Sequence, residues 1–159
     1  MKNKPIVLFD IDYTIFDTDY FKKSSLTKHR IFEEVKDVLD RLGKVAILGI
    51  FSEGDLEFQR KKLKETAIYD YFEKDNTHIV LSKLADLRKV LARYKNRKTF
   101  FVDDKLSILF EAKKIFPEVV TIWVRRGIYA LNQKEISGFK PDAIVENLQE
   151  LVTIVSSKL

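Results

Sequence analysis

Apolar residues along the chain gather in six short runs, separated by longer segments with a helical spacing of apolar positions. The runs cover residues 5–9, 45–51, 78–81, 99–102, 119–124 and 142–145. Most of them lack alternation with polar residues, which is typical of parallel strands buried on both faces. We therefore predict a mostly parallel sheet of five to six strands.

The segments between these runs have apolar residues three and four positions apart, as in helices that pack on one face. This spacing predicts helices over 27–42, 55–67, 84–94, 105–116 and 148–155. The last helix would begin after Asn147, whose spacing to Glu150 resembles a capping box. Because strands and helices alternate, we expect a doubly wound, Rossmann-like α/β fold. No interdomain linker interrupts the pattern, and we expect residues 1–159 to form a single domain.

Composition narrows the class of protein. Of the 159 residues, 45% are hydrophobic and 33% are charged, which is typical of a globular domain. The chain has no cysteine, which excludes a disulfide scaffold and a thiolate zinc site. No apolar run approaches the ~20 residues needed to cross a bilayer, and the first run ends at Asp10, too soon for a signal peptide. We therefore expect a cytoplasmic protein with no membrane partner.

The formal net charge of +5 favours anionic partners, such as phosphate esters or nucleic acid. The lysines are interspersed with glutamates, however, and such a pattern is also typical of a solvated surface. The charge therefore leaves a nucleic-acid partner open without requiring one.

Side chains suited to catalysis follow the predicted strands at the sheet edge where ligands bind in doubly wound folds. In strand order they are Asp10 and Asp12, Ser52 and Glu53, Lys83, and Asp103 and Asp104. Two acids next to a buried strand need a partner, because a buried charge is costly unless it is paired. We expect these side chains to converge on one edge of the sheet.

This constellation resembles the haloacid dehalogenase-like (HAD) hydrolase superfamily. The first motif of the family, Asp-x-Asp-x-Thr or Val after the first strand, is matched by "DIDYT" at 10–14. The second motif of the family is a hydroxyl at the end of the second strand, matched by Ser52. The third is a lysine, matched by Lys83, and the fourth is a pair of acids, matched by Asp103 and Asp104. The resemblance covers essentially the whole chain and is to phosphatase-like members.

The resemblance implies a Mg²⁺-dependent phosphohydrolase that acts on a phosphate monoester. Asp10 would attack phosphorus and form an aspartyl-phosphate, which water then hydrolyses. Asp12 would protonate the leaving alkoxide and then deprotonate the water. Mg²⁺ prefers oxygen ligands, which the side chains of Asp10, Asp103 and Asp104 and the backbone carbonyl of Asp12 would supply.

The phosphate would be bound by Ser52, by Lys83 and by the backbone N–H of Glu53. The Glu53 side chain departs from the asparagine common in the family, and it would repel phosphate unless it faces away or holds a cation. Ser52 also fits a helix N-cap, because Ser52-x-x-Asp55 has capping-box spacing. Ser82 has the features of an N-cap too, which would put Lys83 in a first helical turn, where a cation is unfavourable unless an anion is held there.

Other interpretations of the lysine and of the acid pair stay open. If Lys83 were solvated, another lysine would bind the phosphate, and the rivals are Lys61, Lys62 and Lys64. Asp103 and Asp104 also fit caps of the helix predicted over 105–116. The fourth motif of the family often has a further acid four or five residues on, where this chain has Ile108 and Leu109.

Many members of the family carry a lid domain between the first two motifs or between the second and third. Here the predicted helix 27–42 and strand 45–51 fill most of the first interval, and helix 55–67 and strand 78–81 fill the second. Only 13–26 is left, which is enough for a flap. The resemblance implies that such capless members act on large substrates or complete the site by oligomerising. We expect a phosphorylated substrate, small or macromolecular, and leave a homo-oligomer open.

Two further functions stay open from the sequence. A receiver-type phospho-accepting domain also combines a doubly wound sheet with acids, a hydroxyl and a lysine, but its acceptor would follow the third strand, where this chain has Ser82 and Lys83. A catalytically weak HAD-like binding or regulatory domain is favoured by Glu53 and by the shortened fourth motif. Dehalogenation is disfavoured, because the acid pair would have no use in it.

Overall fold

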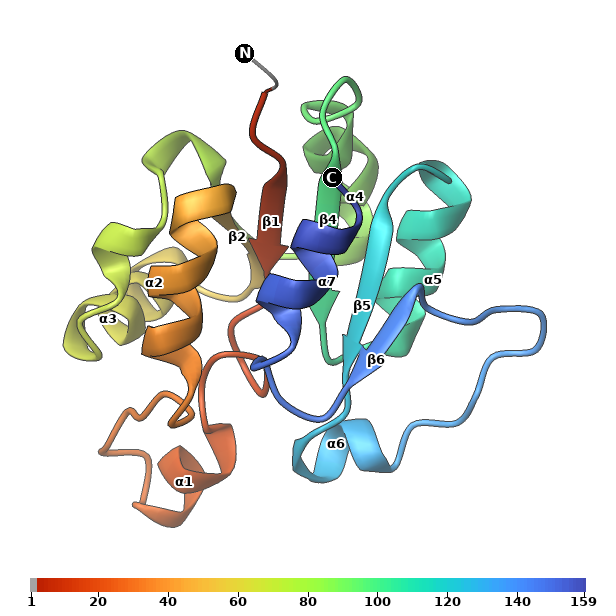
Figure 1. Cartoon of the computed structure of the whole chain (residues 1–159). Coiled ribbons are helices and arrows are strands. Elements are labelled where there is room, and N and C mark those ends of the chain that lie inside the picture. The colour runs from red at the N-terminus through yellow and green to blue at the C-terminus, as the bar shows by residue number, and fades with distance from the viewer. Residues whose placement is uncertain (1–2) are drawn as a thin grey trace.

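The computed structural model describes residues 3–159, in which helices cover both faces of one parallel sheet (Figure 1). Every neighbouring pair of strands is parallel, in the order β3-β2-β1-β4-β5-β6. The strands are β1 (Ile6–Phe9), β2 (Ile47–Glu53), β3 (Thr77–Val80), β4 (Thr99–Asp103), β5 (Val120–Val124) and β6 (Ala143–Val145). The six predicted strands and the doubly wound α/β class are confirmed.

The strand order also decides between two predicted functions. The order 3-2-1-4-5-6 is that of the Rossmann fold, whereas receiver domains share the flavodoxin-like order 2-1-3-4-5. The receiver-type interpretation is therefore wrong. In the Rossmann order, the chain direction across the sheet reverses between β1 and β4, so their carboxyl ends flank the crevice in which ligands bind.

Seven helices connect or follow the strands in the described residues. They are α1 (Thr18–Lys23), α2 (Val35–Val45), α3 (Leu56–Glu65), α4 (Lys83–Ala92), α5 (Leu106–Ile115), α6 (Gly127–Leu131) and α7 (Leu151–Ser157), and short 3₁₀ turns span Tyr69–Tyr71 and Lys74–Asn76. The interval from Asp10 to Ser52 contains α1 and α2, and the interval from Ser52 to Lys83 contains α3 and the 3₁₀ turns. As predicted, these described intervals hold no lid domain.

The hydrophobic core lies on both sides of the sheet, which explains the unbroken apolar runs. Val7 and Phe9 of β1 belong to the core under α2 and α7, whereas Ile6 and Leu8 belong to the core under α4 and α5. Successive side chains of a strand point to opposite faces. Every residue of β1 is therefore apolar and fully buried.

Two predicted helices begin later than the apolar spacing indicates. Residues 27–34 are not helical, because the backbone there bonds to the segment after β1: the Asp17 N–H donates to the Arg30 carbonyl at 2.9 Å, and the Phe32 N–H to the Ile15 carbonyl at 3.0 Å. The last helix begins at Leu151 rather than at residue 148, and the Asn147 side chain accepts from the Gln149 N–H instead of capping it.

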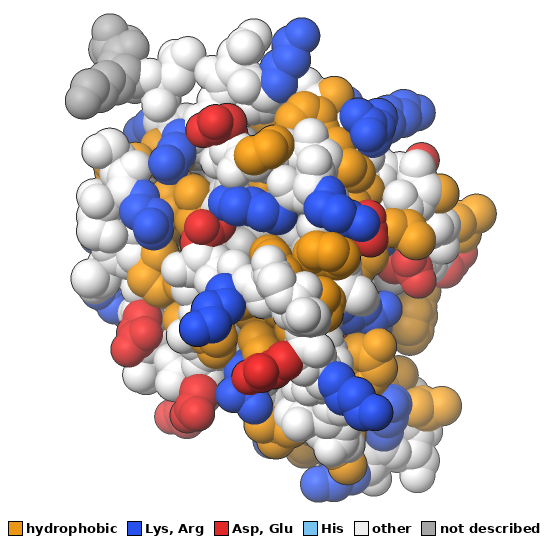
Figure 2. Space-filling model, turned by 90° about the vertical axis from the view of Figure 1, so that its right-hand side faces the viewer, with side chains coloured by type: hydrophobic (Ala, Val, Ile, Leu, Met, Phe, Trp, Pro, Cys, Tyr) orange, Lys and Arg blue, Asp and Glu red, His pale blue; other side chains and the backbone are white. Residues whose placement is uncertain are grey.

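The surface agrees with the predicted distribution of charge. Figure 2 shows the side of the molecule that lies at the right of Figure 1, and Lys and Arg side chains are spread over it with acidic and apolar side chains between them. The positive charge is thus distributed over this face rather than gathered at one place. Among residues 3–159, no helix has both the length and the apolar character needed to cross a bilayer.

Candidate active site

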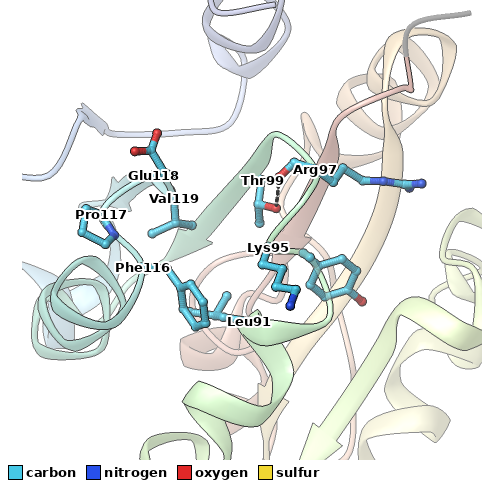
Figure 3. A pocket seen from close by; sticks show the side chains of 9 residues that line it. Leu91, Lys95, Arg97, Thr99, Phe116, Pro117, Glu118 and Val119 are labelled. Atoms are coloured by element: carbon cyan, nitrogen blue, oxygen red, sulfur yellow. Dashed lines mark hydrogen bonds between the residues drawn. The ribbon is translucent and has the colours of Figure 1, made fainter.

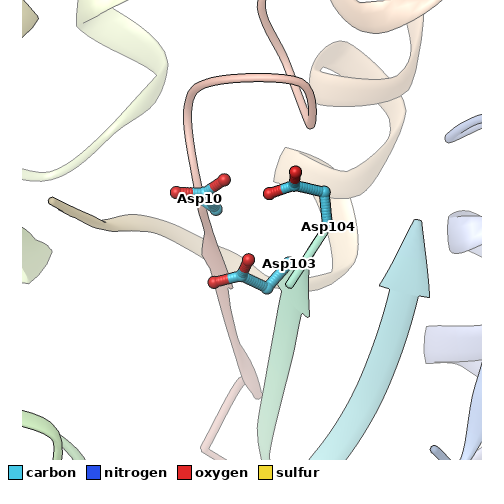
Figure 4. Close-up of side chains that lie close together, drawn as sticks. All are labelled: Asp10, Asp103 and Asp104. Atoms are coloured by element: carbon cyan, nitrogen blue, oxygen red, sulfur yellow. The ribbon is translucent and has the colours of Figure 1, made fainter. Parts of the chain in front are cut away.

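Three aspartates meet at the carboxyl end of the central strands. The β1 and β4 strands are neighbours in a register that pairs Phe9 with Val102, so the residues that follow them, Asp10 and Asp103, lie side by side. Figure 4 shows the carboxyl groups of Asp10, Asp103 and Asp104 pointing toward one another, and one oxygen of each lies within 4.8 Å of the others. All three residues are buried. The predicted convergence of these acids at one edge of the sheet is confirmed.

Lys83 enters this group from the first turn of α4. Its Nζ donates to Asp10 Oδ1 and to Asp103 Oδ2, both at 2.7 Å, and its side chain is 3% exposed. Burial alone would lower the pKa of Lys83, but the two carboxylates outweigh it and raise that pKa. Ser82 caps α4 by accepting from the Ala85 N–H, as predicted. The interpretation of Lys83 as a solvated lysine is wrong.

The group of acids holds more negative charge than Lys83 can neutralise. Burial raises the pKa of Asp104 to about 10, with Asp10 and Asp103 adding to the shift. Burial and the charge of Asp103 also raise the pKa of Asp10, to about 6, although Lys83 opposes them. Among the described residues, Lys83 is the only cation that pairs with these acids. Three buried carboxylates facing one lysine form an all-oxygen donor set that fits a hard divalent cation.

The side chain of Asp12 turns away from this group and binds other partners. Its Oδ1 accepts from Lys62 Nζ at 2.6 Å and from Thr18 Oγ1 at 3.4 Å, and its Oδ2 accepts from Gln59 Nε2 at 3.1 Å. The Asp12 carboxylate is thus outside the three-aspartate group that could hold a metal ion. Both of its oxygens are occupied by donors of the protein.

Helix α3 positions the two donors that hold Asp12. Gln59 and Lys62 are three residues apart and therefore share one helix face, and both are buried although they are polar. Lys62, which the sequence left open as an alternative to Lys83, binds Asp12 instead of Asp10. Gln59 was not predicted to belong to the site. Its signal in the sequence is its helical spacing to Lys62, in a helix that follows a strand end.

Ser52 lies beneath Gln59 and is not the cap of α3. That cap is Asp55, whose Oδ1 accepts from the Phe58 N–H at 2.8 Å, so the cap interpretation of Ser52 is wrong. The Ser52 side chain is buried, its Oγ accepts from Gln59 Nε2 at 3.4 Å, and it does not line the cavity over Asp10. Its role as a phosphate ligand stays a prediction.

Glu53 faces the N-terminus of α4. Its Oε2 accepts from the backbone N–H of Lys83 at 2.8 Å, where the positive end of the helix dipole favours a negative charge. Glu53 also lines the cavity over Asp10, so it is not turned away from the place predicted for phosphate. Among the described residues its carboxylate forms no ion pair, and the helix N-terminus holds it instead of a cation.

Asp103 and Asp104 are held at the start of the segment that leads into α5. Asp103 Oδ1 accepts from the Lys105 N–H at 2.8 Å, while its other oxygen binds Lys83. The backbone carbonyl of Asp104 accepts from Trp123 Nε1 at 2.9 Å and from Gln133 Nε2 at 2.6 Å. The cap of α5 is Lys105. The two acids thus do not serve as the cap residue of that helix.

A cavity of about 260 Å³ opens over Asp10. The residues that line it come from five of the segments at the carboxyl edge of the sheet and are Asp10, Asp12, Tyr13, Glu53, Lys83, Asp104, Lys105, Ile108 and Tyr129. Tyr129 belongs to α6. Sequence reasoning did not single out Tyr13 or Lys105, for which the sequence offers no signal beyond nearness to the motifs.

A smaller pocket lies at the opposite edge of the sheet, where β4 and β5 begin (Figure 3). Its volume is about 90 Å³, and Leu91, Phe116 and Val119 give it apolar walls. Glu118 is the only acid among its lining residues. Because no group of acids converges there, the chemistry predicted from the motifs belongs to the cavity over Asp10.

Comparisons with known proteins agree with this geometry. No family model and no curated protein matches the chain. A candidate HAD-like hydrolase from Burkholderia xenovorans is similar in structure, with 23% identity, 98% coverage of each chain and a TM-score of 0.80. A candidate phosphatase from Clostridium difficile has 21% identity and a TM-score of 0.70, covering 98% of this chain and 100% of that one.

A third similar structure is that of the candidate HAD hydrolase YfnB from Bacillus subtilis, which was solved with magnesium bound. It is 12% identical, covers 97% of this chain and 99% of its own, and has a TM-score of 0.72. Haloacid dehalogenases are also among the similar structures. At these identities the likeness shows the fold, which is that of the HAD-like hydrolases.

Proposed function

We propose that this chain, which has the HAD-like hydrolase fold, is a Mg²⁺-dependent phosphohydrolase that cleaves phosphate monoesters through an aspartyl-phosphate on Asp10. The observation that supports this most directly is the buried group of three aspartates next to Lys83. Burying so many like charges is costly and serves no purpose in packing. Phosphoryl transfer needs such a group, because it combines a carboxylate nucleophile with sites for positive charge.

Asp10 forms a bond to phosphorus as the bond to the leaving-group oxygen breaks. Lys83 Nζ stays within 2.7 Å of Asp10 and reduces the repulsion between the carboxylate and the incoming phosphate. When bound by Asp10, Asp103 and Asp104, Mg²⁺ supplies further positive charge that lets the two anions approach. Water then hydrolyses the aspartyl-phosphate, which releases phosphate and restores Asp10.

Asp12 serves as the acid and base of the two steps. It lines the cavity two residues from Asp10, and Lys62 and Gln59 fix the direction of its carboxylate. Each carboxylate oxygen can accept two hydrogen bonds, and Oδ2 accepts one from Gln59 Nε2. Oδ2 therefore keeps a lone pair through which Asp12 can give a proton to the leaving group and later accept one from water.

Asp12→Asn is expected to slow catalysis most for substrates with poor leaving groups. The amide cannot protonate an alkoxide, and positioned acid catalysis contributes about 10²–10⁴-fold. Rates of an alkyl phosphate and of p-nitrophenyl phosphate should be compared, since nitrophenolate leaves without a proton. Equal losses for the two substrates would show that Asp12 is not the acid.

Lys62→Met is expected to lower kcat for the alkyl phosphate while Lys62→Arg retains part of it, because only the arginine still holds the Asp12 carboxylate. Loss of this charged hydrogen bond should also lower the free energy of unfolding by about 2 kcal/mol, measured in urea. Lys61→Met is the matched control, since the Lys61 side chain is 64% exposed and its one ion pair among the described residues is with Glu65 at 3.6 Å. In an Asp12→Asn background, Lys62→Met should change kcat little further, and an additive loss would refute the link to Asp12.

A substrate screen with and without Mg²⁺ tests the function as a whole. p-Nitrophenyl phosphate, nucleotides, sugar phosphates and phosphopeptides would be compared by phosphate release, and 2-chloropropionate by chloride release. We expect phosphate release that depends on Mg²⁺. Chloride release without phosphate release would identify a dehalogenase. The absence of both would favour the catalytically weak binding or regulatory domain.

A further inference from the structure

Two tyrosines form one side of the cavity over Asp10. Tyr13 follows Asp12 in the chain, and Tyr129 belongs to α6, yet their rings stack with centroids 6.4 Å apart and planes 21° from parallel. Both residues line the same cavity as Asp10. The leaving group of any ester attacked by Asp10 therefore lies close to an aromatic surface.

The backbone on both sides of this contact has unusual conformations. Tyr13 has a φ of 63°, in the left-handed region that bulky side chains rarely adopt. Gly127, which begins α6, has a φ of 77°, and a Cβ there would lie 2.7 Å from Tyr13 Cδ1. Only a glycine allows α6 to approach the Tyr13 ring this closely. Backbone strain of this kind gathers at functional sites.

The Tyr13 ring is held firmly, whereas the Tyr129 ring remains partly free. The Tyr13 hydroxyl donates to Asp19 Oδ1 at 3.3 Å and accepts from Lys22 Nζ at 2.9 Å, and its N–H donates to Thr18 Oγ1 at 3.1 Å. Tyr129 is 48% exposed. A fixed ring thus supports a second ring that solvent reaches, and the half-exposed ring is available to a ligand.

The cavity is small and encloses only part of a substrate. Its volume of about 260 Å³ is below the ~300–1,000 Å³ typical of sites for drug-sized ligands. It therefore encloses one ring close to the phosphate, and larger parts of a substrate extend into solvent. Lys105 Nζ lies 5.9 Å from the centroid of the Tyr129 ring, and Ile108 adds an apolar side chain to the lining. Four acids also line the cavity. The part of the lining that suits a flat apolar ring is therefore the part formed by the two tyrosine rings and Ile108, with Lys105 beside it.

We propose that Tyr13 and Tyr129 form an aromatic wall that selects phosphate monoesters whose leaving group places a single planar ring next to the phosphate. The inference rests on the proposed phosphohydrolase function and adds the substrate class to it. A nucleotide fits this wall less well, because a ribose separates its base from the phosphate.

The test compares two esters that differ in the ring alone. Benzyl phosphate and cyclohexylmethyl phosphate both release a primary alcohol, so a difference in kcat/KM reports recognition of the flat ring and not the ease of leaving. We expect the wild-type protein to prefer benzyl phosphate by about three- to tenfold, the size of one aromatic contact. Tyr129→Phe should keep this ratio and Tyr129→Leu should bring it close to one. Ile128→Ala is the control, because Ile128 is 65% exposed on the same helix and does not line the cavity.

Three results would overturn the aromatic wall. They are equal kcat/KM values for the two esters in the wild type, an equal loss of both esters in Tyr129→Leu, and a higher kcat/KM for adenosine 5′-monophosphate than for benzyl phosphate. If neither ester is hydrolysed, calorimetry with benzylphosphonate and cyclohexylmethylphosphonate tests the wall by itself, whereas the phosphohydrolase proposal fails only if no phosphate ester of the screen is hydrolysed. Equal affinities for the two phosphonates would refute it, and a preference for the benzyl compound that Tyr129→Leu removes would support it.

Discussion

Replacing Asp10 with asparagine is expected to lower the rate of phosphate release on the order of 10⁴–10⁶-fold, as the loss of a nucleophile does in other enzymes. The amide keeps the shape of the side chain but cannot attack phosphorus. The fold should persist, because Lys83 still pairs with Asp103 at 2.7 Å and one of the three crowded acids has been replaced by a neutral amide. Steady-state phosphate release and circular dichroism measure the two halves of this prediction.

The same variant tests whether Asp10 is the nucleophile or a residue that only binds the substrate. The wild-type protein, quenched in acid during turnover, should retain label from a ³²P-phosphate ester, and Asp10→Asn should retain none. Asp70→Asn provides the matched control, because Asp70 is exposed on a 3₁₀ turn and forms no ion pair in the described structure. Turnover by Asp10→Asn at the wild-type rate would refute the proposed role of Asp10.

Removal of divalent cations with EDTA is expected to abolish activity, and Mg²⁺ should restore it. Mg²⁺ should also raise the thermal midpoint of the protein, because in the proposed site it would be held by three buried acids that, among the described residues, pair only with Lys83. At a concentration 100 times the dissociation constant, the gain in free energy of unfolding is about 2.7 kcal/mol. Scanning fluorimetry over a series of Mg²⁺ concentrations would measure it.

Asp104→Asn isolates the metal from the rest of the fold. The asparagine keeps the shape of Asp104 and the backbone carbonyl that Trp123 and Gln133 bind. Without metal, this variant should therefore be at least as stable as the wild type, while the rise in thermal midpoint with Mg²⁺ should be lost. Full activity in EDTA would contradict the proposal and favour the chemistry of a dehalogenase.

The strands could be predicted because each one depends on its own residues. In β1, Ile6 and Leu8 pack on one side of the sheet and Val7 and Phe9 on the other. An unbroken apolar run is the only local pattern that buries both faces of a strand. Acids placed directly after such runs in parallel strands had to reach one edge of the sheet, and the group formed by Asp10, Asp103 and Asp104 follows from that.

The helix starts were harder to predict, because long-range backbone bonds override local spacing. Residues 27–34 continue the apolar pattern of α2, yet Arg30 and Phe32 bond to the backbone of the segment after β1. The partners of Arg30 and Phe32, which are Asp17 and Ile15, lie more than two helical turns away in the sequence.

The sequence by itself thus determined the class of fold, the edge of the sheet that holds the site and the acids of that site. The tertiary structure alone decided which partner each acid receives: Lys83 for Asp10, and Lys62 with Gln59 for Asp12. It also decided that Tyr129 meets Tyr13. The physical reason is that periodicity fixes only the face that a helix turns to the sheet, whereas the order of the strands sets which helices and loops meet across it.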